Sequence, residues 1–249
     1  MDGVSQVRIG TAGWSIPRVV ANRFPSEGSG LQRYAACFNA AEINSSFYRP
    51  HKIETYARWR DATPPGFKFA VKAPRAITHH AKLTGYGEAL AVFVTEAKAL
   101  GPKLGPLLIQ LPPSLSFDPI VAGRFFEDLR ATFAGAVVCE PRHPTWFAPE
   151  AEAMLHAFQV ARVAADPAPH ARAAEPGGWP GLAYWRLHGS PRMYFSPYAE
   201  EALQALADRL AASAAKGRWC IFDNTASGAA ADDALKLAAM LRGRPAPAG

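Results

Sequence analysis

The sequence predicts an α/β fold, a single (β/α)8 barrel of the TIM type. Eight short apolar runs are spread along the chain, and most of them end on a polar or ionisable residue. The segments between them are helical or irregular in character, with apolar residues spaced by three and four. The length of 249 residues is close to the roughly 250 of one such barrel. Because strands that alternate with helices most economically close into a parallel barrel, we expect one domain on this plan.

The expected strands are the short apolar runs themselves. They cover residues 7–10, 41–44, 67–72, 107–110, 137–140, 161–166, 182–188 and 219–224. The expected helices lie between the strands, where apolar residues recur at helical spacing. They cover residues 31–38, 53–62, 88–100, 119–130, 150–158, 198–215 and 229–241. Active sites of such barrels lie at the carboxyl ends of the strands, so the polar strand ends are expected to converge.

Two segments depart from the regular alternation. Residues 166–181 are rich in Pro, Ala and Gly where a crossover helix should follow the sixth strand. We interpret this irregular segment as a loop over the barrel mouth. Residues 243–249 lack periodicity, and we expect them to form a disordered tail after a barrel domain of residues 1–242.

Composition narrows the class of protein. Lys plus Arg number 27 against 21 Asp plus Glu, a net charge of +6, but the basic residues are scattered along the chain. A solvated basic surface is therefore favoured over a dedicated nucleic-acid surface. The three cysteines lie far apart with no C-x-x-C pair, which indicates reduced thiols in a cytoplasmic protein. No run approaches the roughly 18 apolar residues of a membrane span, so we expect no membrane attachment.

Eight short motifs, taken in order along the chain, are similar to those of a known family. They are GTAGWS from Gly10, EINSSFY from Glu42, FKFAVK from Phe67, ITH from Ile77, QLPP from Gln110, EPRHPTWF from Glu140, RLHG from Arg186 and FDNT from Phe222. Through them the chain resembles the YecE-like proteins, the domain-of-unknown-function family 72, over about residues 7–241. The resemblance implies a TIM-type barrel. It supplies no substrate and no reaction, because the biochemical function of that family is not established.

Strand side chains alternate between two faces, so parity sorts the residues that point to the barrel axis. In the strand 182–188, Arg186 and His188 share the face opposite the bulky Trp185 and Leu187, and we expect them to point inward. The same argument on the other strands gives the expected mouth: Glu42, Asn44, Lys72, Gln110, Glu140, Arg142, Asp166, Arg186, His188 and Asn224. This set contains three carboxylates, three fixed cations and one histidine.

Such a set of charges has two interpretations. A buried carboxylate without a partner is strongly destabilising, so the residues can form an internal network of salt bridges that stabilises the barrel top. Alternatively, they surround a ligand pocket, because barrel mouths are the usual ligand sites and ionisable groups with shifted pKa values gather there. We favour the pocket.

The basic side chains and the carboxylates of this set indicate which kind of ligand the pocket would bind. Arg142, Arg186 and Lys72 suit a phosphate or a carboxylate, because guanidinium groups form bidentate bonds to both anions. A divalent metal on the carboxylates is less favoured, since the sequence contains no H-x-H or H-E-x-x-H spacing and the neighbouring cations would repel the ion. We therefore expect a small anionic ligand, no metal and no cofactor.

Acid–base catalysis is the chemistry that these residues favour. A histidine titrates near neutrality, and burial can raise the pKa of a carboxylate toward the same range. Glu140 and His188 are the best candidate proton carriers, although an inward histidine is more often structural. The full set of candidate catalytic residues is Glu140, His188, Glu42 and Asp166.

The candidate substrate-binding residues lie on strand ends and on the loops after them. They are Lys72, His79, Gln110, Arg142, Arg186, Asn224, Asn44, Trp14, Tyr48 and Trp146. Aromatic side chains at a pocket rim can stack on sugar faces or bases, whereas the alternative is that each packs the loops onto the barrel top. The chain has no G-x-S-x-G, G-x-G-x-x-G or P-loop motif, which argues against a serine triad, dinucleotide chemistry and ATP hydrolysis.

Two classes of function remain. The first is an enzyme, such as a hydrolase, lyase or isomerase, that acts by acid–base catalysis on a polar, anionic small molecule such as a phosphorylated sugar or nucleotide fragment. The second is a non-catalytic binding protein for small molecules or nucleic acid that uses the same basic and aromatic rim. A basic groove that extends well beyond the pocket would favour the second class.

Overall fold

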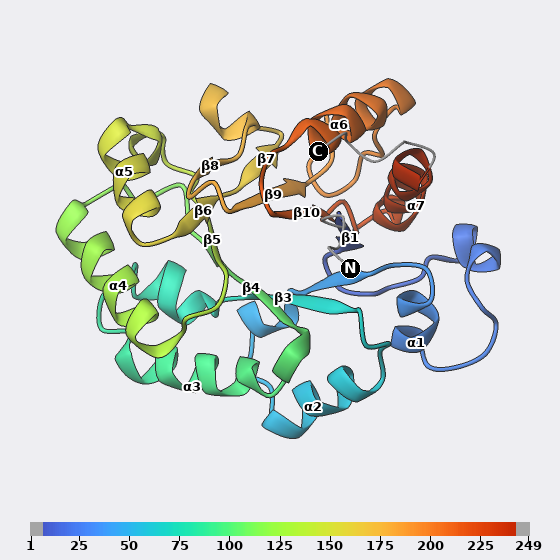
Figure 1. The fold of residues 1–249 in the computed structure, drawn as a ribbon, viewed down its shortest axis with the longest axis horizontal. Helices are drawn as coiled ribbons and strands as arrows, with labels where there is room; N and C mark the ends of the chain where they lie inside the picture. Colours follow the sequence, from blue (N-terminus) through green and yellow to red (C-terminus); the bar gives the residue numbers. More distant parts are fainter. Residues whose placement is uncertain (1–6, 243–249) are drawn as a thin grey trace.

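The structure, a computed structural model, describes residues 7–242 as a mixed α/β fold with two largely parallel sheets (Figure 1). The strands of the first sheet, in spatial order, are β1 (Arg8–Thr11), β10 (Gly217–Phe222), β9 (Leu182–Leu187) and β7 (Ala164–Asp166). Those of the second are β2 (Ala40–Ile43), β3 (Lys68–Lys72), β4 (Leu104–Gln110), β5 (Val137–Glu140), β6 (Val160–Arg162) and β8 (Gly177–Gly178). All neighbouring strands are parallel except β6 and β8, which are antiparallel. The tail expected at 243–249 lies outside the described residues.

The two sheets adjoin at two places. Between β1 and β2, the isolated parallel bridge of Ala12 with Glu42 links them. At the other junction, the expected sixth strand is divided into β6 and β7 by Val163, whose N–H donates to Cys139 O at 2.8 Å. All eight expected strands are confirmed in position. The single closed ladder is not seen, because the hydrogen-bonded strands are divided between two sheets.

Helices lie around the outside of the strands (Figure 1). All seven expected helices are confirmed: α1 (Gly30–Ala35), α2 (Ile53–Asp61), α3 (Gly87–Lys98), α4 (Pro119–Thr132), α5 (Pro149–Ala157), α6 (Glu200–Ala212) and α7 (Ala229–Arg242). Capping side chains determine where two of these helices begin. Ser29 forms a capping box with Gln32 at α1, and Asp118 accepts from two backbone N–H groups at the start of α4.

Buried side chains form two cores on opposite faces of the strands. The larger core lies between the strands and the helices. The smaller one collects residues from most of the strands of both sheets: Ala40, Ala70, Leu108, Val138, Ala161, Val163, Leu182, Tyr184, Trp219 and Ile221. Because alternate residues of a strand face opposite ways, the smaller core identifies the inward positions on each strand. These positions decide which polar strand ends can meet.

The irregular segment 166–181 packs partly along β6, and its expected position over the barrel mouth stays a prediction. The segment contains the short 3-10 helix Ala171–Ala174 and then β8, which runs antiparallel to β6. Arg162 donates from Nη1 to the carbonyls of Arg172 and Glu175 at 2.9 and 3.1 Å. The chain therefore returns along β6, whose backbone pairs with β8 and whose buried Arg162 donates to carbonyls of the segment.

Replacement of Gly10 by Ala should be strongly destabilising. The added Cβ would collide with the backbone carbonyl of Ala40 and lie 3.0 Å from the hydroxyl of Tyr34, at the place where β1 passes β2. Overpacking of this kind costs about 1–3 kcal/mol, and a backbone neighbour puts the loss near the upper end. Chemical denaturation measures the loss.

Gly123→Ala in the middle of α4 is the control, because nothing lies within 4 Å of its added Cβ. That variant should gain roughly 0.5–1 kcal/mol from the helix propensity of Ala. Equal stabilities of the two variants would contradict the close approach of β1 and β2.

Candidate active site at the strand ends

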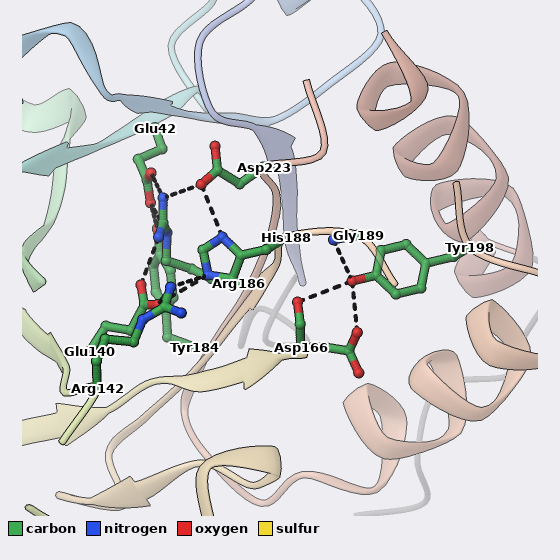
Figure 2. A network of polar contacts seen from close by, with 10 residues as sticks. All are labelled: Glu42, Glu140, Arg142, Asp166, Tyr184, Arg186, His188, Gly189, Tyr198 and Asp223. Carbon is green, nitrogen blue, oxygen red and sulfur yellow. Dashed lines mark hydrogen bonds and ion pairs between the residues drawn. The ribbon is translucent and has the colours of Figure 1, made fainter. Parts of the chain in front are cut away.

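Five ionisable side chains from both sheets converge where their strands end (Figure 2). Glu42 and Glu140 come from β2 and β5, and Arg186 comes from β9. His188 lies just beyond the last residue of β9, and Asp223 directly follows β10. The convergence of these side chains confirms the inward direction expected for Glu42, Glu140, Arg186 and His188.

Arg186 is the centre of this network and has no exposed surface. Its Nε donates to Glu42 Oε2 at 3.0 Å and its Nη2 to Glu42 Oε1 at 2.6 Å. Its Nη1 donates to Glu140 Oε2 at 2.6 Å, and Nη2 also donates to Asp223 Oδ2 at 3.0 Å. The Tyr184 hydroxyl donates to Glu42 Oε2 at 3.0 Å. One guanidinium thus donates hydrogen bonds to three buried carboxylates.

His188 lies between partners that suit either protonation state of its ring. Its Nδ1 is 3.1 Å from Asp223 Oδ2, and its Nε2 is 3.0 Å from Glu140 Oε1 and 2.9 Å from Arg142 Nη2. A neutral ring with its proton on Nδ1 donates to Asp223 and accepts from Arg142. A protonated ring donates to both Asp223 and Glu140. The surroundings therefore provide hydrogen bonds before and after a proton transfer, which suits a general acid–base residue.

The network is fully buried except at one edge. Its fully buried members are Glu42, Glu140, Arg186 and His188. Solvent reaches Asp223 and Lys72 slightly, at 5% and 6% exposure, and the Arg142 side chain at 12%. Within residues 7–242, the Arg142 Nε is buried and has no hydrogen-bond partner. The least buried edge of the network is therefore formed by Lys72, Arg142 and Asp223, and it includes one unpaired guanidinium N–H.

The charges of the network set the pKa values of its carboxyl groups. Burial would raise the pKa of Glu140, but the cations Arg142 and Arg186 lower it well below the ordinary value. Burial likewise opposes ionisation of Asp223, and Arg186 lowers the pKa of that group. Both carboxylates are therefore ionised at neutral pH. Glu140 suits the anchoring of cations better than the donation of a proton.

Asp166 does not join the network, so its expected inward direction was wrong. Its Oδ1 accepts from the Tyr198 hydroxyl at 2.9 Å, away from the Arg186 cluster (Figure 2). Asp166 and Ala164 line a pocket of about 220 Å³ between β7, β9 and α6. The pattern misled because the run around Ala164 is apolar on both faces, and Val163 is the residue that faces inward.

Asn224 also points away, and the parity expected for the last strand was wrong. Its Nδ2 donates to Asp233 Oδ2 on α7 at 2.7 Å. Trp219 and Ile221 belong to the inner core, so Asp223 is the polar residue that faces inward. Both faces of this strand carry large apolar side chains, so the alternation of residue types did not show which face points inward. Sequence reasoning therefore missed Asp223, whose only signal was its place beside Asn224 at the strand end.

Three other predicted residues surround Lys72 or the network. His79 is half-buried, its ring lies 4.9 Å from that of Phe47, and burial and the charge of Lys72 lower its pKa. Asn44 follows β2, and its Oδ1 is buried without a partner among residues 7–242. Gln110 ends β4, half-buried, in register with Glu140.

The three predicted aromatic contacts divide into packing and surface residues. Trp14 contacts Trp59 and Phe69 edge-on at 5.1 and 6.2 Å, which attaches it to the outer core. Trp146 is buried and donates from Nε1 to Leu115 O at 3.0 Å, so it packs its loop as in the alternative interpretation. Tyr48 is 64% exposed and remains available for a ligand.

Comparison with known proteins identifies the family. The sequence profile described as "protein of unknown function DUF72" matches residues 8–248. The chain belongs to the DUF72 family. It is 34% identical over 169 residues to the UPF0759 protein YecE of Escherichia coli K12, and 34% identical over 143 residues to YecE of Escherichia coli O157:H7. These matches cover 66% and 57% of this chain and 60% and 50% of the two relatives, so they span about half of the length of these relatives.

Solved DUF72 structures share the fold. A DUF72 family protein from Enterococcus faecalis V583 superposes with a TM-score of 0.81 at 19% identity, covering 95% of this chain and 96% of its own. A DUF72 family protein from Thermotoga maritima MSB8 has a TM-score of 0.77 at 26% identity, with coverages of 95% and 99%. The α/β arrangement with parallel sheets is therefore a property of the family.

Two features of residues 7–242 concern the expected absence of a membrane span and of a metal. No helix in this part of the chain is both long and apolar enough to span a membrane. The same residues contain no group of three or more His, Cys, Asp or Glu side chains placed to bind a metal ion. In the candidate site the carboxylates are bound to arginines instead.

Glu140→Gln should be markedly destabilising. The amide would leave Arg142 and Arg186 with one less buried negative charge, and breaking a buried pair costs about 3–5 kcal/mol. The exposed Glu150→Gln is the matched control and should change stability by less than about 0.5 kcal/mol. Urea unfolding measures both. A loss below about 1 kcal/mol for Glu140→Gln would show that the network does not depend on this charge.

Acid should weaken the fold through the same carboxylates. A carboxyl group whose pKa is lowered on folding stabilises the protein above its unfolded pKa of about 4, and this contribution is lost as pH falls through the folded pKa. The free energy of unfolding should therefore decrease as pH falls below about 5. Asp223→Asn should flatten this dependence, whereas the exposed Glu200→Gln should not. Denaturant titrations at a series of pH values provide the slopes, and identical slopes in Asp223→Asn and the parent would refute the assignment.

Proposed function

We propose that this protein is an enzyme that acts by acid–base catalysis on a polar, anionic small molecule at the carboxyl ends of its strands. The observation that carries the proposal is the edge of the buried network, where Arg142 lies beside His188 and where Lys72 is close enough to Arg186, Glu42, Glu140 and Asp223 for their charges to shift its pKa. In the same proposal, the two sheets together form the expected (β/α)8 barrel, with this edge at its mouth. Barrel mouths are the usual place for such chemistry.

The proposed roles follow from which groups are already bonded. Arg186 donates four hydrogen bonds to carboxylates of the chain, so we assign it to anchoring instead of substrate binding. Arg142 keeps an unused Nε and is the proposed anion site, with Lys72 at the same edge. His188 is the proposed proton carrier, and Asp223 is its positioning residue. Glu140 holds Arg142 and His188 in place.

The reaction is assigned to the hydrolase, lyase or isomerase classes, which share proton transfer to or from the substrate. Proton transfer by a positioned side chain contributes about 10²–10⁴-fold to a rate. The fixed charges around His188 also need no reorganisation when charge develops on a bound substrate. An anionic group on the substrate gives Arg142 a partner for its free guanidinium edge.

Phosphate and sugar phosphates should raise the melting temperature. A ligand at about 100 times its Kd stabilises the folded state by about 2.7 kcal/mol. This corresponds to roughly 5 to 10 °C for a domain of this size. Differential scanning fluorimetry with inorganic phosphate and a set of sugar phosphates measures the shift. Arg142→Met should abolish it, because it removes the proposed anion ligand.

Arg58→Met serves as the control, since Arg58 is exposed on α2. This variant should keep the full phosphate-induced shift. A shift that is equally large in Arg142→Met would sink the proposed anion site.

A non-catalytic binding protein is the second candidate function. The observation in its favour is a pair of exposed aromatic residues that contact arginines. The Arg75 guanidinium lies 5.9 Å from the ring centroid of Tyr48, and that of Arg192 lies 4.0 Å from that of Phe195. Such pairs suit stacked bases. Binding of a labelled single-stranded oligonucleotide that survives Arg142→Met but is lost in Tyr48→Ala would favour this candidate.

A further inference from the structure

Lys72 occupies an unusual position for a lysine. It is the last residue of β3, two positions after Ala70 of the inner core, so its side chain points inward. Its Nζ lies 4.1 Å from the ring centroid of Phe47, and the residue is 6% exposed. Within residues 7–242, the Nζ has the Phe47 ring as its close contact and no hydrogen-bond acceptor.

The surroundings favour a neutral amine on Lys72. Burial, and then the charge of Arg186, lower its pKa from the ordinary 10.5 to about 8, against the opposing effect of Glu42, Glu140 and Asp223. At pH 8 about half of this amine is unprotonated, against less than about 1% for an ordinary lysine. Only the unprotonated form carries a lone pair, so only that form is a nucleophile.

Lys103 shows what a purely structural buried lysine looks like in the same chain. It is similarly buried, at 8% exposure. Its Nζ, however, donates to the carbonyls of Arg60 and Thr63 and to the Thr63 hydroxyl. These acceptors explain why that ammonium is buried. Among residues 7–242, the Lys72 Nζ has no comparable acceptor, and the residue lies at the least buried edge of the site.

We propose that Lys72 is a nucleophile that forms an imine with the carbonyl carbon of an anionic aldehyde or ketone. The proposal rests on the proposed function and specifies its substrate class: a carbonyl compound that also carries a phosphate or carboxylate. Arg142 binds the anionic group, while Lys72 reaches the carbonyl. Imine-forming lysines are commonly activated by a desolvated site or by a neighbouring cation, and Lys72 has both.

Imine formation conserves atoms and charge and releases one water molecule. The neutral amine attacks the carbonyl carbon, a C–N bond forms, and the C=O electron pair moves to oxygen, which gains a proton. The resulting carbinolamine transfers the remaining amine proton and loses its hydroxyl as water, leaving a C=N bond. Protonation of this imine withdraws electrons from the substrate, so a neighbouring C–H proton becomes removable. His188 is the proposed carrier of these protons.

Reductive trapping tests the inference. The full protein is incubated at pH 8 with dihydroxyacetone phosphate or, separately, with pyruvate, in the presence of sodium cyanoborohydride, which reduces imines to stable amines. Peptide mapping by mass spectrometry then locates the modified lysines. Lys72 should be modified at least tenfold faster than the exposed Lys52, because its neutral fraction is about a hundredfold larger than that of an ordinary lysine. It should also react faster than Lys103, whose Nζ is held by three acceptors although burial lowers the pKa of that lysine too.

The comparison among lysines lies within one folded protein, so it does not depend on a variant that folds. Lys72→Arg, which keeps the charge but removes the nucleophile, should eliminate the fast modification. Modification of Lys72 at the rate of Lys52 would overturn the inference. If the phosphate shift still depended on Arg142 in that case, the proposed function would stand without the imine. If neither the fast modification of Lys72 nor the Arg142-dependent phosphate shift is observed, both the imine and the proposed function are overturned.

Discussion

The buried guanidinium of Arg186 constrains the relative positions of four strands. A buried charge is tolerated only with compensating partners, and here the partners are Glu42, Glu140 and Asp223. Arg186 and Asp223 belong to the first sheet, whereas Glu42 and Glu140 belong to the second. The charged hydrogen bonds therefore join the sheets near the place where backbone pairing between β1 and β2 is reduced to the bridge at Ala12. The inner apolar core supplies the contact below them.

The same network orders the candidate site into two layers. The sealed layer is occupied by bonded charges, and its cost in desolvation is offset by near-complete pairing. The outer layer contains Arg142 and Lys72. Arg142 pairs with Glu140 and keeps an Nε without a partner among residues 7–242, and the Lys72 Nζ contacts the Phe47 ring. Side chains fixed by a bonded layer beneath them are held in a defined geometry, which is what a catalytic group requires. Stability and site geometry thus depend on the same contacts.

The sequence predicted the elements well and the contacts between them less well. Strand and helix positions follow from the local periodicity of apolar residues, which can be recognised in the sequence. Parity succeeded on β9, where the bulky Trp185 marks the outer face beside Arg186. It failed for Asn224 and Asp166, because the strands before them are apolar on both faces. The sequence did not predict that Val163 divides the strand ladder. It also did not predict that Arg186 binds carboxylates of the chain instead of a ligand. Both features depend on distances between strands, which local sequence patterns do not contain.

Charge balance decides which states of Lys72 the site stabilises. Arg142 and Arg186 are permanent cations that lie against the carboxyl groups of Glu42, Glu140 and Asp223. Burial and the charge of Arg186 favour loss of the Lys72 proton, whereas the three carboxyl groups oppose it, and the result is a pKa of about 8. In the proposed reaction, a protonated imine at Lys72 carries the same positive charge as the ammonium. The carboxyl groups that disfavour the neutral amine therefore stabilise the protonated imine that follows it, so the site binds the intermediate more strongly than the nucleophile.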